Sequence, residues 1–254
     1  MKRLIMRDIY LIRKNLLITF GIFTGLFLVG FIIALSAKYG NIARYVSDPD
    51  FISDILQVSS YFAIIAGIIL ATSLEHVPGI INKDYKNGWH QYMMSSGMKP
   101  GMVIGVRFLL ISGIFLTSII LSIGSLSLMQ RVSGEAMESI FHTGLGAHEG
   151  QLILIYGAVA CLILDDYFTL MEYIYKGRNS QKAEIIKGLP IMIIMIIDGI
   201  LYANDKLEIM IEKLKELTEH VALLYIVPIL SGIVITLICF IISVKLVKKE
   251  GRHV

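Results

Sequence analysis

The sequence predicts an all-α, polytopic membrane protein with six transmembrane helices. Three observations support this fold class: a high apolar content, long stretches without any charge, and an uneven distribution of basic residues. Of the 254 residues, 56% are hydrophobic and 17% are charged, and the mean hydropathy is +0.73. So few polar residues cannot cover a globular domain in water. The composition therefore excludes a soluble or nucleic-acid-binding protein, although the formal net charge is +3.

Four stretches contain no Asp, Glu, Lys or Arg, and each is long enough to cross a bilayer. They comprise residues 15–37, 55–74, 108–130 and 221–244. A helix needs about 20 mainly apolar residues to span the hydrocarbon core. Because lipid offers no partner to an unpaired backbone amide, we expect these stretches to be helical.

Two weaker spans are interrupted by acidic residues. Residues 151–171 are apolar except for Asp165 and Asp166, and residues 188–204 are apolar except for Asp198. With both included, residues 1–254 form a single transmembrane domain. Its six spans are expected near residues 16–36, 55–75, 108–130, 151–171, 188–204 and 221–244.

The distribution of Lys and Arg tests this count. With six spans and a cytoplasmic N-terminus, 17 of the 23 basic residues fall on the inner side and 6 on the outer side. Such an excess is typical of cytoplasmic segments. Because only an even number of spans puts both basic ends on one side, we expect both termini to be cytoplasmic.

Residues 1–14 have the pattern of a basic amphipathic helix. Apolar residues recur at helical spacing, and basic residues share the opposite side; the two sets are Ile5, Ile9, Ile12 and Leu16, and Arg3, Arg7 and Lys14. This pattern favours a helix on the inner membrane surface. The alternative is an unstructured basic flank.

The outer segment 205–219 is amphipathic as well. Leu207, Ile211 and Leu214 lie on its apolar stripe. We expect a helix that lies on the outer surface or caps the bundle between spans five and six, or else an extension of one of these spans.

Residues 76–107, which join spans two and three, are too many for a simple turn and should have structure of their own. This segment combines charges with aromatic and methionine side chains, and it contains the only tryptophan of the chain, Trp89. Such enrichment is typical of a docking surface. An aromatic belt at the membrane interface is the alternative.

Acidic residues inside spans are costly, so their positions indicate function. Asp198 lies about 15 Å into its span, close to mid-bilayer. It is expected to serve a cavity or translocation path, or to make a buried structural hydrogen bond. Asp165 and Asp166 lie nearer the inner end of their span. The favoured interpretation is that this pair reaches water, and a translocation role is the alternative.

Small residues in the first span bear on helix packing. Gly21 and Gly25 form a G-x-x-x-G pattern, and Gly30 follows. This spacing allows close approach of helix backbones. The favoured interpretation is packing within one chain, and a contact between subunits is the alternative.

Sequence motifs for enzymatic chemistry are missing. The chain contains no P-loop, no H-E-x-x-H and no G-x-S-x-G. We therefore expect a protein that is not an enzyme and that binds no cofactor or metal itself. If ATP drives it, a partner must hydrolyse the ATP.

Several of these residues match a known pattern. The whole chain resembles the permease subunit of ABC-2-type exporters, above all at Glu75, which ends span two, at Asp84-Tyr85-Lys86 and at Trp89-His90-Gln91-Tyr92. It departs from that pattern at Ser96-Gly97, where Leu-Pro is common, and at Arg107, where lysine is usual. Within the family it is similar to bacterial exporters of amphipathic cytolytic or antimicrobial peptides.

The resemblance implies a multi-pass protein of the bacterial plasma membrane that works by alternating access. Its partners would be two cytoplasmic ATPase subunits, which bind ATP and Mg²⁺, and a second permease copy or paralogue. Residues 76–107 would couple the permease to the ATPase through Asp84, Tyr85, Lys86, Trp89, His90 and Tyr92. The competing hypotheses are an ion-coupled secondary transporter that uses Asp198 and, less favoured, an intramembrane enzyme.

Overall fold

The computed structural model describes residues 2–45, 48–133, 147–176, 185–193 and 221–250, and within these ranges every element is a helix. The elements are α1 (Lys2–Tyr39), α2 (Asn41–Tyr45), α3 (Pro49–Ala71), the 3₁₀ helix η1 (Thr72–Glu75), α4 (His76–Lys86), α5 (Trp89–Ser95), α6 (Pro100–Ser133), α7 (Ala147–Tyr175) and α10 (Val221–Glu250). Residues 185–193 are helical too. The prediction of an all-α chain is confirmed for the described residues.

Among the described residues, five helical stretches are long and apolar enough to cross a membrane. They are Lys2–Tyr39, Asp50–Lys86, Pro100–Val132, Gly150–Tyr175 and Ala222–Lys249. These contain five of the six expected spans and support a membrane-embedded protein. The expected span 188–204 begins within the helical residues 185–193. Its remainder, including Asp198, lies outside the described residues, as does the outer segment 205–219.

The N-terminal segment is not a separate surface helix. α1 runs without a break from Lys2 to Tyr39, so residues 2–14 and the first span form one helix. The residues of α1 that are buried near its N-terminus are Ile12, which belongs to the predicted apolar face, and the acidic Asp8. The prediction that Arg7 lies on the polar outer side is wrong, because its side chain is directed at α4.

The connection between α3 and α6 is almost entirely helical. η1 and α4 continue directly from α3, and Gly88 and Gly97 follow α4 and α5 with φ angles of +71° and +76°. Glycine adopts this left-handed backbone without steric cost, which allows each helix to end sharply. α6 begins at Pro100, earlier than the predicted residue 108, because proline is well suited to the first helical turn. Arg107 consequently lies within α6 rather than in the connecting segment.

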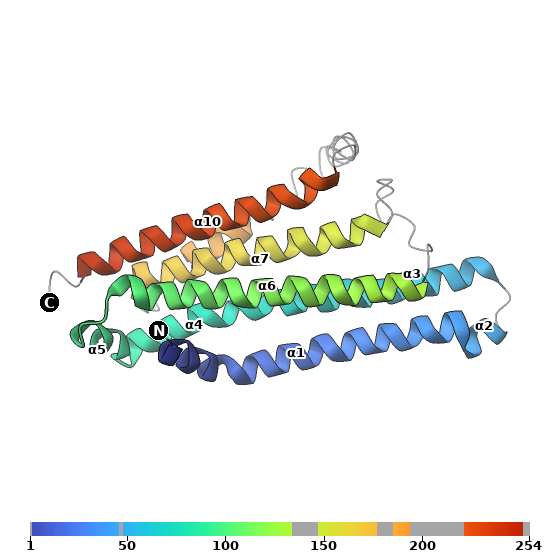
Figure 1. Cartoon of the computed structure of the whole chain (residues 1–254), viewed down its shortest axis with the longest axis horizontal. Helices are drawn as coiled ribbons and strands as arrows, with labels where there is room; N and C mark the ends of the chain where they lie inside the picture. The colour runs from blue at the N-terminus through green and yellow to red at the C-terminus, as the bar shows by residue number, and fades with distance from the viewer. Residues whose placement is uncertain (1, 46–47, 134–146, 177–184, 194–220, 251–254) are drawn as a thin grey trace.

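The long helices lie side by side along one axis (Figure 1). α1 packs on α3, α3 on α6, α6 on α7, and α7 on α10. The start of α1, the segment α4–α5 and the last turns of α7 and α10 gather at one end of the bundle, here called the α5 end. The main apolar core joins α1, α4, α6 and α7 near this end through residues such as Ile12, Val77, Ile111 and Ile155.

Gly30, and not the Gly21–Gly25 pair, forms the close contact between α1 and its neighbour. A Cβ atom placed on Gly30 would come within 2.7 Å of Phe62 Cβ and 2.9 Å of the Ser59 carbonyl oxygen on α3. A Cβ on Gly21 or Gly25 would meet no atom of the described residues within 4 Å. Packing of Gly21 and Gly25 within the chain, the favoured interpretation, is therefore not seen among the described residues, and a contact between subunits stays a prediction.

Candidate functional site

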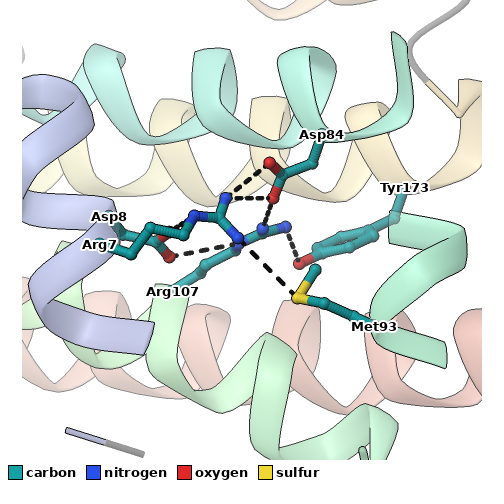
Figure 2. Close-up of polar contacts among 6 residues, drawn as sticks. All are labelled: Arg7, Asp8, Asp84, Met93, Arg107 and Tyr173. Carbon is teal, nitrogen blue, oxygen red and sulfur yellow. Dashed lines mark hydrogen bonds and ion pairs between the residues drawn. The ribbon is translucent and has the colours of Figure 1, made fainter. Parts of the chain in front are cut away.

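Four charged side chains and one tyrosine meet inside the protein at the α5 end (Figure 2). We call this set the charge cluster: Arg7 and Asp8 of α1, Asp84 of α4, Arg107 of α6 and Tyr173 of α7. Four helices that are distant in sequence therefore contribute to one group of contacts.

Asp84 is the centre of the charge cluster. Arg7 donates from Nη2 to both carboxylate oxygens of Asp84, at 2.6 Å and 2.7 Å. Arg107 donates from its own Nη2 to Asp84 Oδ2. Since two guanidinium groups share one carboxylate, Asp84 connects α4 to α1 and to α6 at the same time.

Asp8 supplies the second negative charge. Its carboxylate lies 3.3 Å from Arg7 Nε and 3.6 Å from Arg107 Nε. Arg107 also donates from Nη1 to the Tyr173 hydroxyl at 3.2 Å. The two arginines and two aspartates balance, which allows Arg107, only 1% exposed, to remain charged inside the protein.

Arg7 extends the charge cluster to α5. Its Nη1 lies 3.9 Å from Met93 Sδ, and its guanidinium carbon lies 4.8 Å from the centre of the Trp89 ring. Trp89 in turn stacks on Tyr92 with 5.1 Å between ring centres. Cation–π contacts of this kind add to the attachment of α5, which itself is only seven residues long.

His90 also attaches α5 to the rest of the protein, through ring contacts with Tyr85 and Tyr173. It is buried and stacks on Tyr85, with 4.2 Å between ring centres, next to Tyr173. Burial, and secondarily the positive charge of Arg107, lowers the pKa of His90 from 6.5 to about 4. His90 is therefore neutral at physiological pH.

Comparisons with protein-family models, curated proteins and solved structures give no match.

The six residues predicted to contact an ATPase differ in their exposure to solvent. Lys86 and Tyr92 are exposed, whereas Tyr85 and Trp89 are half-buried, and Asp84 and His90 are buried. A direct contact between Asp84 and an ATPase disagrees with this geometry, because both carboxylate oxygens of Asp84 are bound within the chain. Glu75 is the last residue of η1, where α3 gives way to α4, and its side chain is not among those described.

The favoured interpretation of the acidic pair in span four is wrong. Asp165 and Asp166 do not reach water, since they are only 1% and 0% exposed. The Thr236 hydroxyl of α10 donates to Asp166 Oδ2 at 2.5 Å. The pair therefore lies at the helix interface rather than at the membrane surface.

A second polar contact joins α4, α7 and the start of the helix at residues 185–193. Glu172 Oε1 forms an ion pair with Lys187 and accepts a hydrogen bond from Asn82 at 3.4 Å. Tyr167 donates to the carbonyl oxygen of Ile186 at 2.6 Å. These contacts place the described start of the predicted fifth span beside the end of α7.

Asp8, Tyr173 and Glu172 were not predicted from the sequence as site residues, and Arg7 was predicted only to lie on the basic face of an amphipathic helix. One signal was available: Asp8 is the sole acid among the first 14 residues. An acid in an otherwise basic helix is consistent with a partner inside the protein, but the sequence does not identify that partner.

Proposed function

We propose that this chain is the membrane permease subunit of an ATP-driven exporter of the ABC-2 type, with amphipathic or antimicrobial peptides as its substrates. The observation that carries the proposal is the construction of α4–α5. This short helical segment exposes the side chains of Lys83, Lys86 and Tyr92. Through Asp84, the charge cluster attaches the same segment to three long helices.

Such an arrangement is suited to transmit movement. A partner that displaces α4–α5 acts on Asp84, and through the two guanidinium groups on α1 and α6. Pulling Asp84 away alone would leave the buried Arg107 and the half-buried Arg7 with too few counter-charges, which is unfavourable. The helices therefore move together with the segment, as alternating access requires. ATP and Mg²⁺ would bind to the separate ATPase, and a second permease copy or paralogue would complete the pathway.

The proposal is tested by co-purification of the tagged chain with soluble proteins from its own operon, among which we expect a P-loop ATPase. We expect the double variant Lys86→Ala/Tyr92→Ala to insert and fold normally but to lose most of the bound ATPase, because docking energy is concentrated in a few exposed anchors. Tyr45→Ala is the matched control, since Tyr45 is 87% exposed and lies in α2 rather than in α4–α5. Full retention of the ATPase by the double variant would contradict this docking surface.

An ion-coupled carrier is the second candidate, and one observation favours it. The buried acids Asp165 and Asp166 lie within a span, as does Asp198 by sequence. If this candidate holds, transport in vesicles follows an imposed pH or sodium gradient without ATP, and Asp166→Asn and Asp198→Asn each abolish it. ATP-dependent transport that both variants retain would exclude this candidate.

A further inference from the structure

An apolar groove runs along α1 near the α5 end. Its volume is about 620 Å³, and its walls include Ile9, Leu17 and Phe20 of α1 and Leu109 and Gly113 of α6. Ser73, Thr117 and Ser118 are the polar residues among its lining. Because the groove opens on a helix that is mostly apolar and exposed, its natural occupant is an apolar chain.

A basic hollow adjoins this groove. It measures about 530 Å³ and is lined by Arg13, Lys14, Leu17 and Ile18, so Leu17 belongs to both. Arg13 lies four residues after Ile9 and four before Leu17, and residues at this spacing share one face of a helix. The guanidinium group of Arg13 therefore leaves α1 on the side of the groove.

The charges of Arg13 and Lys14 are available to a ligand. Both side chains are exposed, and neither has a carboxylate partner among the described residues, in contrast to Arg7 and Arg107. Arg13 packs its guanidinium 3.9 Å from the centre of the Tyr10 ring. These two residues are also the last charges before the uncharged stretch 15–37. They are therefore at the level where lipid phosphates meet the hydrocarbon core.

We propose that the groove and the basic hollow together bind one anionic phospholipid. An acyl chain occupies the groove, and the phosphate contacts Arg13 and Lys14. A cationic rim beside an apolar channel complements a molecule with a negative head and a hydrocarbon tail. A second copy of the chain fits less well, because a symmetric contact through this face would bring the basic residues of two copies together.

The test measures the lipid that the purified protein retains. The protein is exchanged into detergent micelles that contain phosphatidylglycerol and phosphatidylcholine, and the bound lipid is identified by native mass spectrometry. We expect one preferred phosphatidylglycerol per chain. Arg13→Gln and Lys14→Gln should each weaken this binding roughly fivefold, as expected for one basic residue at an anionic surface. Arg131→Gln, an exposed change in the last turn of α6, should have no effect.

A groove-filling variant tests the acyl-chain site without breaking packing. A Cβ on Gly113 meets no atom within 4 Å in the part of the chain that the structure describes, so Gly113→Leu can fill the groove while the chain still folds. Gly124→Leu is the matched control on the same helix, since Gly124 is equally open but does not line the groove. We expect only Gly113→Leu to abolish the preference for phosphatidylglycerol.

Two results would overturn the proposal. One is equal retention of both lipids by the wild-type protein. The other is a Gly113→Leu protein that keeps its phosphatidylglycerol. If Gly113→Leu instead converts a dimer into a monomer and leaves lipid retention unchanged, the groove is filled by a second copy of the chain.

Discussion

Arg107 is almost completely buried and remains charged because three polar partners surround it. Asp84, Asp8 and Tyr173 come from three other helices. A buried ion pair contributes little net stability compared with an apolar pair, but removing one member is strongly destabilising. The charge cluster therefore specifies how α1, α4, α6 and α7 fit together.

The variant Asp84→Asn tests whether the charge cluster holds α1, α4, α6 and α7 together. The change leaves Arg7 and Arg107 with a single carboxylate, that of Asp8, so we expect the free energy of unfolding to fall by about 3–5 kcal/mol. Denaturant unfolding in micelles measures it. Asp54→Asn, at an exposed position of α3, should change stability by less than about 0.5 kcal/mol. Equal stability of the two variants would show that the charge cluster does not hold these helices together.

His90 makes the stability dependent on pH. Its folded-state pKa is about 4, below the 6.5 of an unfolded histidine. Between these values the unfolded chain binds a proton that the folded chain does not, so stability is complete above pH 6.5 and decreases as the pH falls towards 4. The whole loss is on the order of 3 kcal/mol.

The variant His90→Gln isolates this effect from other titrating groups. We expect the difference in unfolding free energy between wild type and variant to be constant above pH 6.5 and to shift against the wild type as the pH falls to 4. A difference that stays the same over this whole range would mean that His90 takes up its proton equally in both states.

At the scale of elements, α1 and α3 depend on one glycine for their close approach. Gly30→Ala would force a methyl group against Phe62 and the Ser59 carbonyl, and we expect a loss of about 1–3 kcal/mol in thermal or denaturant unfolding. Gly21→Ala is the control, because no described residue lies close to that position and alanine favours the helix. If both variants behave alike, the tight contact at Gly30 is not a determinant of packing.

At the scale of the whole molecule, the ends of the helices favour an even number of spans. The start of α1 and the end of α10 lie at the same end of the bundle (Figure 1). In intact cells, cysteines placed at Ser47 and Ser139 should therefore react with a membrane-impermeant thiol reagent. A cysteine at Ser180 should react only after permeabilisation. Labelling at Ser180 in intact cells would contradict the six-span topology.

Much of the fold was predictable because hydrophobic length is a local property. Stretches of 20 or more uncharged residues identified four spans directly, and each lies within a described helix. Helix ends were less predictable. A charged residue such as Arg7 or Arg107 normally indicates that a span has ended and that the chain is in water. Here α1 and α6 include these residues, because the carboxylate of Asp84 neutralises both charges within the protein.

The candidate site was likewise predictable only in part from the sequence. The sequence alone determined that the chain is apolar, helical and membrane-embedded, and that residues 76–107 have structure of their own. Only the tertiary structure decided that Asp84 faces inward, that Asp165 and Asp166 are buried, and that Gly30 rather than Gly21 meets α3. The physical reason is that burial of a charge depends on its counter-charge, and Arg7 and Asp84 are 77 residues apart in the chain. No local pattern pairs residues so far apart.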